Sequence, residues 1–226
     1  MKSLDADTVG ILEAVGWSEV PAELDYPFSA VVKANSKYNL AATARFPIQI
    51  EAITKNIRHA ALHAVPKGGP FADTHFFFVH LSPLLETDRL RELDITLPIA
   101  SAFPHTAIMG DFNSLSPHDP YDRGGLLAAL RAIDIKKFGE RELAFDVIRR
   151  MESEGWIDAM RALKQPFAFS VPTPVNEDKY HVDALRLDYA FLSPGIASKL
   201  KDARIVRNEA TDFASDHYPI VIDLAE

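Results

Sequence analysis

The chain has 226 residues, of which 47% are hydrophobic and 25% charged, a composition typical of a globular protein with a buried core. Its net charge of -8, from 24 basic and 32 acidic residues, argues against a broad basic surface that wraps nucleic acid. It contains no cysteine, which excludes disulfides and thiolate metal sites, and no uninterrupted apolar run long enough to span a bilayer.

The first half of the chain is predicted to form strands separated by turn residues. Residues 6–13 favour a short buried strand that ends at Glu13. Residues 66–70, Pro-Lys-Gly-Gly-Pro, predict a hairpin-type connection, and the strand after it ends at His80. The further strands predicted in this half are residues 26–33, 39–44, 57–65 and 74–81.

Helices are predicted mainly after the hairpin-type connection, where apolar residues recur at helical spacing. The predicted helices are residues 84–98, 126–133 and 140–154, and the predicted strands are residues 106–109, 185–193, 203–206 and 218–222. No internal repeat and no linker is visible. Strands outnumber helices, which indicates a layered α/β sandwich of two sheets with helices outside, as one domain over residues 1–226.

The strand over residues 106–109 leads into Gly110-Asp111-Phe112-Asn113. In an extended segment, the i and i+2 spacing places the side chains of Asp111 and Asn113 on one face. A carboxylate can bind a metal or take a proton from water, and an amide can donate a hydrogen bond to a developing oxyanion. Taken alone, the same residues also fit a strand end followed by an Asx turn, which is common.

Other polar residues stand at predicted strand ends. Hard cations such as Mg²⁺ prefer oxygen ligands, and we expect Glu13 and Asp216 to provide them. Asp188 and His217 form a pair if their strands are neighbours, and the carboxylate then keeps the histidine protonated. Alternation over residues 185–193 places Arg186 on the same face as Asp188. Together with His80, these groups suit attack of water on a phosphate ester.

These segments resemble the signatures of the endonuclease/exonuclease/phosphatase superfamily, which includes deoxyribonuclease I. They occur in the family's order along nearly the whole chain, so the set is far more specific than each short motif. Leu12 stands where the family usually has Gln. The matching segments are Ile11-Leu12-Glu13, Ala44-Arg45-Phe46-Pro47-Ile48, Val79-His80-Leu81-Ser82-Pro83, Gly110-Asp111-Phe112-Asn113, Arg186-Leu187-Asp188-Tyr189 and Ser215-Asp216-His217-Tyr218-Pro219-Ile220.

The resemblance implies a four-layered α/β/β/α sandwich, with two mostly antiparallel sheets and outer helices. It also implies hydrolysis of a phosphoester, most readily a phosphodiester, with Mg²⁺ or alternatively Mn²⁺. By this resemblance, Glu13 and Asp216 bind the metal, and Asp111 orients or deprotonates the water. Asn113 contacts the phosphate, and His80 assists the leaving group. His217, paired with Asp188, stabilises the transition state.

Two departures from the family's pattern bear on activity. The family begins with a strand carrying an Asn, and only Met1 to Asp5 precede the first strand here, which leaves a sheet edge exposed. His59 also stands where the deoxyribonuclease branch has a Glu that partners the middle histidine, so His80 lacks that support. The alternative is therefore a catalytically impaired protein that binds a phosphate ligand on the same fold.

The substrate stays open among nucleic acid, phospholipid and small phosphoesters, because no Lys/Arg cluster and no clear apolar hairpin stands out. His118, Asp119 and Asp122 offer a second metal site, although a solvated loop is the simpler interpretation. Asp158 is expected to be structural. The absence of cysteine and of a recognisable signal peptide favours a cytoplasmic location, with the native N-terminus and the oligomeric state left open.

Overall fold

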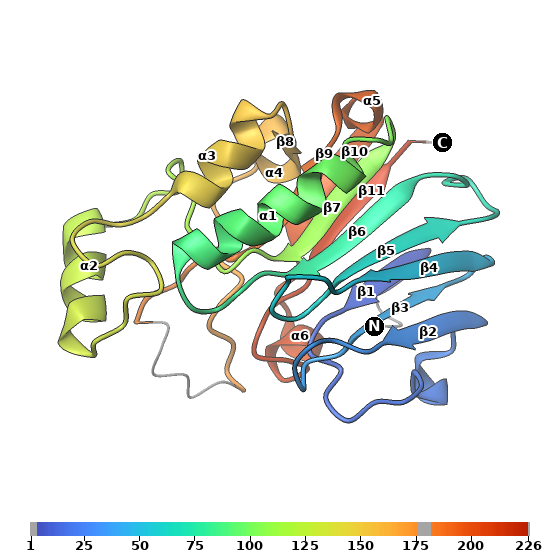
Figure 1. The fold of residues 1–226 in the computed structure, drawn as a ribbon, viewed down its shortest axis with the longest axis horizontal. Helices are drawn as coiled ribbons and strands as arrows, with labels where there is room; N and C mark the ends of the chain where they lie inside the picture. The colour runs from blue at the N-terminus through green and yellow to red at the C-terminus, as the bar shows by residue number, and fades with distance from the viewer. Residues whose placement is uncertain (1–3, 176–181, 226) are drawn as a thin grey trace.

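A six-stranded sheet forms the centre of the molecule (Figure 1). The computed structural model describes residues 4–175 and 182–225. In this sheet β6 and β7 run parallel, and the other neighbouring strands are antiparallel. The strands, in spatial order, are β4 (Ile48–Ile53), β5 (Ala61–Pro66), β6 (His75–His80), β7 (Thr106–Asp111), β9 (Asp188–Leu192) and β8 (Ile157–Asp158).

Helices α1 (Glu86–Ala100) and α3 (Asp146–Ser153) lie across one face of this sheet (Figure 1). Every second side chain of a strand points to the same face, and Phe77, Ile108 and Phe191 point to this one. The apolar stripes of the two helices complete the same core cluster with Leu93, Leu97, Val147, Ile148 and Met151.

Two smaller sheets pack on the other face. One has the order β1-β3-β2, and the other pairs β10 with β11. The alternate residues of β6 and β7, Phe76, Phe78 and Met109, point to this face. They form a second core cluster with side chains from the two smaller sheets, among them Leu40, Ala42, Ala203 and Ile205. The strand bounds are β1 (Thr8–Ile11), β2 (Phe28–Val32), β3 (Leu40–Ala44), β10 (Leu200–Ile205) and β11 (Ile220–Leu224).

A mixed α/β architecture of packed sheets is confirmed, but the layers differ from the prediction. The described residues form three sheets instead of two. Helix α2 (Arg123–Ala132) packs in a separate apolar cluster, so the described helices do not build a second outer layer like that of α1 and α3. The remaining helices are short: η2 (Ala22–Leu24), α4 (Ala159–Ala162), α5 (Pro194–Ala197) and α6 (Glu209–Asp212). None of the helices in the described ranges has the length and apolar character to cross a membrane.

A groove separates the two smaller sheets. Within the described residues, β1 pairs with β3 alone and β11 with β10 alone, so each has an open edge. The groove has a volume of about 780 Å³, and both strands line it together with Phe76, Phe78 and Met109. The residues of β1 and β11 are partly exposed, whereas those of β3 and β9 are fully buried.

Candidate active site

Three polar side chains stand in register on three adjacent strands. The parallel pairing of β6 with β7 sets His80 opposite Asp111, and the antiparallel pairing of β7 with β9 sets Asp111 opposite Asp188. Gly110 permits this close approach: it has φ +131°, and a Cβ there would lie 2.2 Å from the Val79 carbonyl oxygen. The sheet itself therefore gathers three of the predicted site residues at one end.

Asp188 and His217 form a hydrogen-bonded ion pair. His217 Nδ1 lies 2.7 Å from Asp188 Oδ2, and the His217 side chain is one-quarter exposed. Burial disfavours the charged imidazole, but the Asp188 carboxylate, with smaller contributions from Asp111 and Asp216, outweighs it and raises the pKa of His217 to about 10. His217 is therefore an imidazolium at neutral pH. The predicted contact between Asp188 and His217 is present.

His80 lies between two carboxylates. Its Nε2 is 3.6 Å from both Glu13 Oε1 and Asp111 Oδ2. Its side chain is 5% exposed, and burial lowers its pKa despite the opposing charge of Asp111. The imidazole is therefore neutral near pH 7 and can exchange a proton.

Glu13 reaches this region from the end of β1. Its strand approaches β6 so closely at Gly10 that a Cβ there would lie 2.1 Å from the Phe78 ring. The Glu13 side chain is 46% exposed. Partial burial raises its pKa, and the charges of Asp216 and Asp111 raise it further, so both carboxylates act on Glu13.

The donor set fits a hard divalent cation. Glu13, Asp111, Asp188 and Asp216 bring four carboxylates together, beside the imidazolium of His217. Mg²⁺ prefers oxygen ligands and would relieve this repulsion. Ligand atoms of Asp111, Asp188 and His217 also lie within 4.8 Å of one another. A protonated histidine cannot bind a metal, so the carboxylates are the better ligands.

Asn113 approaches Asp111 by a turn, not by strand alternation. β7 ends at Asp111, and Asn113 has φ +50° in the left-handed region. The Asn113 backbone N–H donates to Asp111 Oδ1 at 2.7 Å, and its Nδ2 donates to the Leu81 carbonyl at 2.8 Å. The extended geometry that placed both side chains on one face is therefore wrong. Contact of Asn113 with phosphate stays a prediction.

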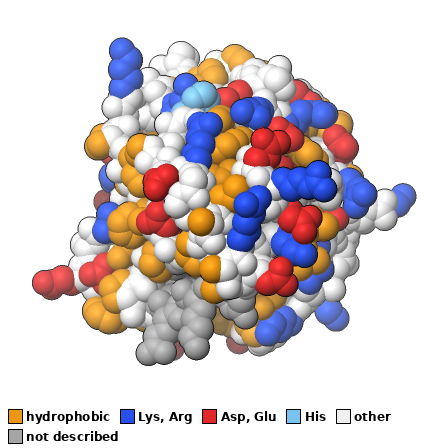
Figure 2. Space-filling model, turned by 90° about the vertical axis from the view of Figure 1, so that its left-hand side faces the viewer, with side chains coloured by type: hydrophobic (Ala, Val, Ile, Leu, Met, Phe, Trp, Pro, Cys, Tyr) orange, Lys and Arg blue, Asp and Glu red, His pale blue; other side chains and the backbone are white. Residues whose placement is uncertain are grey.

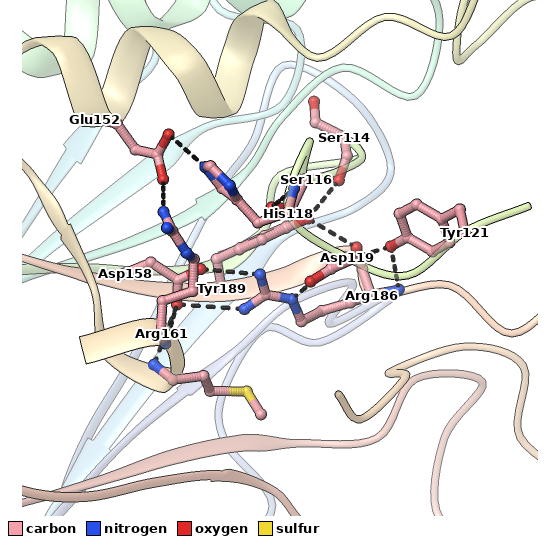
Figure 3. Close-up of polar contacts among 11 residues, drawn as sticks. Ser114, Ser116, His118, Asp119, Tyr121, Glu152, Asp158, Arg161, Arg186 and Tyr189 are labelled. Carbon is pink, nitrogen blue, oxygen red and sulfur yellow. Dashed lines mark hydrogen bonds and ion pairs between the residues drawn. The ribbon is translucent and has the colours of Figure 1, made fainter. Parts of the chain in front are cut away.

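A buried ionic network lies beside the site (Figure 3). Arg186 donates from both terminal nitrogens to Asp158, at 3.2 and 2.9 Å, and from Nε to Asp119 at 3.0 Å. Its guanidinium lies 4.4 Å from the centroid of the Tyr189 ring, and the Tyr189 hydroxyl donates to the Ser114 carbonyl at 3.0 Å. The network ties the loop after β7 to β9, which supports a structural role for Asp158.

Two interpretations of the sequence change here. β9 begins at Asp188, so strand alternation does not extend back to Arg186, whose side chain turns to Asp158 instead. The three residues considered as a second metal site have different partners: His118 binds Glu152, Asp119 binds Arg186 and Asp122 caps α2.

Ser170 is a site-supporting residue that the sequence did not reveal. Its hydroxyl oxygen accepts hydrogen bonds from the backbone N–H groups of Leu187, at 3.0 Å, and Asp188, at 3.2 Å. It lies in the proline-punctuated segment before β9, where no motif marks it. Only the folded chain brings this segment against the start of β9.

Comparison with known proteins identifies the family of this chain. A model of the Endonuclease/Exonuclease/phosphatase family matches residues 1–217, so the chain belongs to this family of phosphoester-hydrolysing nucleases and phosphatases. No curated protein matches the sequence.

Solved structures share the fold. A 3′-5′ exonuclease (NExo) from Neisseria meningitidis has a TM-score of 0.70 at 17% identity, over 97% of this chain and 90% of that one. The 3′ phosphatase NExo from Neisseria bound to product DNA hairpin has a TM-score of 0.68 at 15% identity, over 97% of this chain and 89% of that one. An AP endonuclease from Archaeoglobus fulgidus has a TM-score of 0.63 at 14% identity, over 99% of this chain and 90% of that one. At these identities, the likeness establishes the fold alone.

Proposed function

We propose that the protein hydrolyses phosphodiesters in a reaction that depends on Mg²⁺ or Mn²⁺. The observation that carries this proposal is the charged pair of Asp188 and His217 beside Asp111, with His80 in register on the next strand. The imidazolium can stabilise negative charge. The buried carboxylate and the neutral imidazole beside it can both transfer protons.

Each residue has a distinct task. His217, held as an imidazolium by Asp188, stabilises negative charge that develops on the phosphoryl oxygens. Asp111 accepts the Asn113 N–H through Oδ1, so its Oδ2 is the atom that orients or deprotonates the attacking water. His80, neutral and beside Asp111, assists the leaving group.

The metal would be held by Glu13 and Asp216. A bound Mg²⁺ polarises a phosphoryl oxygen and lowers the pKa of coordinated water. Burial raises the pKa of Glu13, and the charge of Asp216 raises it further, so a cation between the two carboxylates would relieve their repulsion. Their partial exposure leaves room for the water ligands that Mg²⁺ retains.

A nucleic acid is the substrate class that the related structures favour, since one of them holds a DNA hairpin. Lys/Arg and Asp/Glu side chains are interspersed on the described surface of the face that carries α2 (Figure 2). Charges that follow α2 in the chain also pair locally, such as Lys136 with Glu140 and Arg149 with Asp146. This face therefore offers no extended basic surface, and we expect DNA to bind elsewhere, beside the site.

A phosphoester panel tests the proposal. It should include duplex and single-stranded DNA, a 3′-phosphorylated hairpin, an abasic duplex, a phospholipid and a small phosphomonoester, each with Mg²⁺ and with chelator. We expect metal-dependent turnover that Asp111→Asn abolishes. The alternative is a phosphate-binding protein with impaired catalysis. Phosphate binding by calorimetry without turnover of any substrate would favour that alternative.

A further inference from the structure

Packing, not hydrogen bonding, holds the His80 ring. Its Nδ1 has no hydrogen-bond partner within the described part of the chain. Its Nε2 lies 3.6 Å from the oxygens of Glu13 and Asp111, which is longer than an ordinary hydrogen bond. A buried ring without an anchoring hydrogen bond needs another restraint to keep Nε2 directed at the two carboxylates.

His59 provides such a restraint. It lies just before β5, and its ring stacks on that of His80 with centroids 4.3 Å apart and an angle of 11° between the planes. Its residue surface is only 1% exposed. Tyr38 meets both rings edge-on, at 5.4 Å from His59 and 6.1 Å from His80. Stacked and edge-to-face rings restrict one another's orientation.

His59 is itself fixed by the loop between β2 and β3. Its Nδ1 lies 2.7 Å from Ser36 Oγ, which also accepts the Tyr38 backbone N–H at 3.1 Å. The Asn35 backbone N–H donates to the His59 carbonyl at 2.9 Å. Burial, and then the neighbouring His80, lower the pKa of His59 to about 4. The ring is therefore neutral, and no charge opposes the stack near pH 7.

We propose that His59 is a positioning residue for the reaction: its ring, anchored through its backbone by Asn35 and packed against Tyr38 and His80, keeps His80 Nε2 directed between Glu13 and Asp111. The effect on turnover rests on the proposed function. The stack requires an aromatic ring in this place and does not require that the ring titrate. Phenylalanine can therefore replace His59, whereas alanine cannot.

Kinetics of His59→Phe and His59→Ala test this inference. A small misplacement of a catalytic group can cost up to about a hundredfold in rate, so we expect His59→Ala to lower kcat by about ten- to a hundredfold with little change in KM. His59→Phe should stay near wild type. Equal loss in both variants, or full activity in His59→Ala, would overturn the proposal. If His59→Ala does not fold, His59→Gln replaces it, since glutamine also lacks a ring.

A matched control separates positioning from general packing. His63, on β5, stacks on Phe77 with the same centroid distance of 4.3 Å. We expect His63→Ala to lower the thermal midpoint as His59→Ala does, but to keep the wild-type kcat. A loss of kcat in His63→Ala as large as in His59→Ala would show that any lost stack slows the enzyme, and would overturn the specific role.

Two further measurements test whether His59 acts through His80. In a His80→Ala background, adding His59→Ala should cause no further loss of kcat, whereas losses that multiply would contradict the proposal. The His80 ring signals in NMR spectra without substrate should match in wild type and His59→Phe and shift or broaden in His59→Ala. Identical ring signals in all three would also contradict it. The spectra need no turnover, so they test positioning even if the proposed hydrolysis fails.

Discussion

His217 Nδ1 and Asp188 Oδ2 lie 2.7 Å apart, although 29 residues separate them in the chain. The contact joins the start of the central strand β9 to the segment that leads into β11, so two different sheets meet at this pair. The Asp188 backbone N–H is held at the same time by Ser170 Oγ. This bond holds the backbone from which the Asp188 carboxylate reaches the imidazolium.

We predict that Asp188→Asn lowers kcat and leaves divalent-metal affinity nearly unchanged. The amide cannot stabilise the His217 imidazolium, so the cation beside the phosphate is lost. Removal of one preorganised electrostatic contact typically costs about 10²–10³ in rate. Turnover measurements and calorimetric titration with Mn²⁺ check the two parts. Wild-type turnover in Asp188→Asn would contradict the role of the pair.

The sequence predicted most strands and the polar residues at their ends, because strand periodicity and short motifs are local features. It missed β4 (Ile48–Ile53), which begins directly after Pro47 at the edge of the sheet. The predicted helix over residues 140–154 begins only at Asp146.

Contacts between distant segments could not be predicted in this way. The His59–His80 stack depends on how β5 lies against β6, and the left-handed turn at Asn113 depends on the Leu81 carbonyl. Arg186 was assigned to the face of Asp188, but the buried carboxylates of Asp119 and Asp158 determine its direction. In each case a tertiary partner, absent from the local pattern, determines the geometry.

We predict that Glu13→Gln stabilises the metal-free protein while weakening its metal binding. Burial and the charges of Asp216 and Asp111 raise the Glu13 pKa, so the ionised carboxylate destabilises the native state at neutral pH. A neutral amide removes this repulsion but is a poorer ligand. Thermal unfolding with chelator and calorimetry with Mn²⁺ measure the two effects.

Glu51→Gln is the matched control, since Glu51 is exposed on the edge strand β4. We expect it to change neither stability nor metal affinity appreciably. Equal metal affinity in Glu13→Gln and Glu51→Gln would exclude Glu13 as a ligand. The same comparison, made with Asp216→Asn, tests the second ligand.

We predict that Arg186→Met is strongly destabilising. It leaves the buried carboxylates of Asp158 and Asp119 without their cation, and removal of one partner of a buried ion pair typically costs about 3–5 kcal/mol. Arg204→Met is the control, because its contacts with Asp202 and Asp223 are exposed, where such pairs contribute up to about 1 kcal/mol. Denaturant unfolding of both variants measures the difference, and similar losses would argue against a special role for the buried network.

We predict that stability declines with acid partly through His63. Burial lowers its pKa from 6.5 to about 4, with His75 and Lys67 adding to the effect. Its folded pKa lies below the unfolded value, so the unfolded state binds the proton more readily, and stability is lost as pH falls from 6.5 to about 4. His63→Phe keeps a ring against Phe77 and should flatten this slope in urea midpoints measured across that range. An unchanged slope would show that His63 does not titrate on unfolding.

Hydrolysis of an aryl phosphodiester such as bis(4-nitrophenyl) phosphate tests the central claim most directly. The assay compares wild type with Asp111→Asn, each with Mg²⁺, with Mn²⁺ and with chelator, after both proteins are shown to be folded. We expect wild-type turnover that requires the metal, and a loss in Asp111→Asn of about 10²–10⁴, the usual contribution of a general base. Turnover that persists in chelator, or that is equal in the two proteins, would contradict the assignment of this cluster as a metal-dependent hydrolytic site.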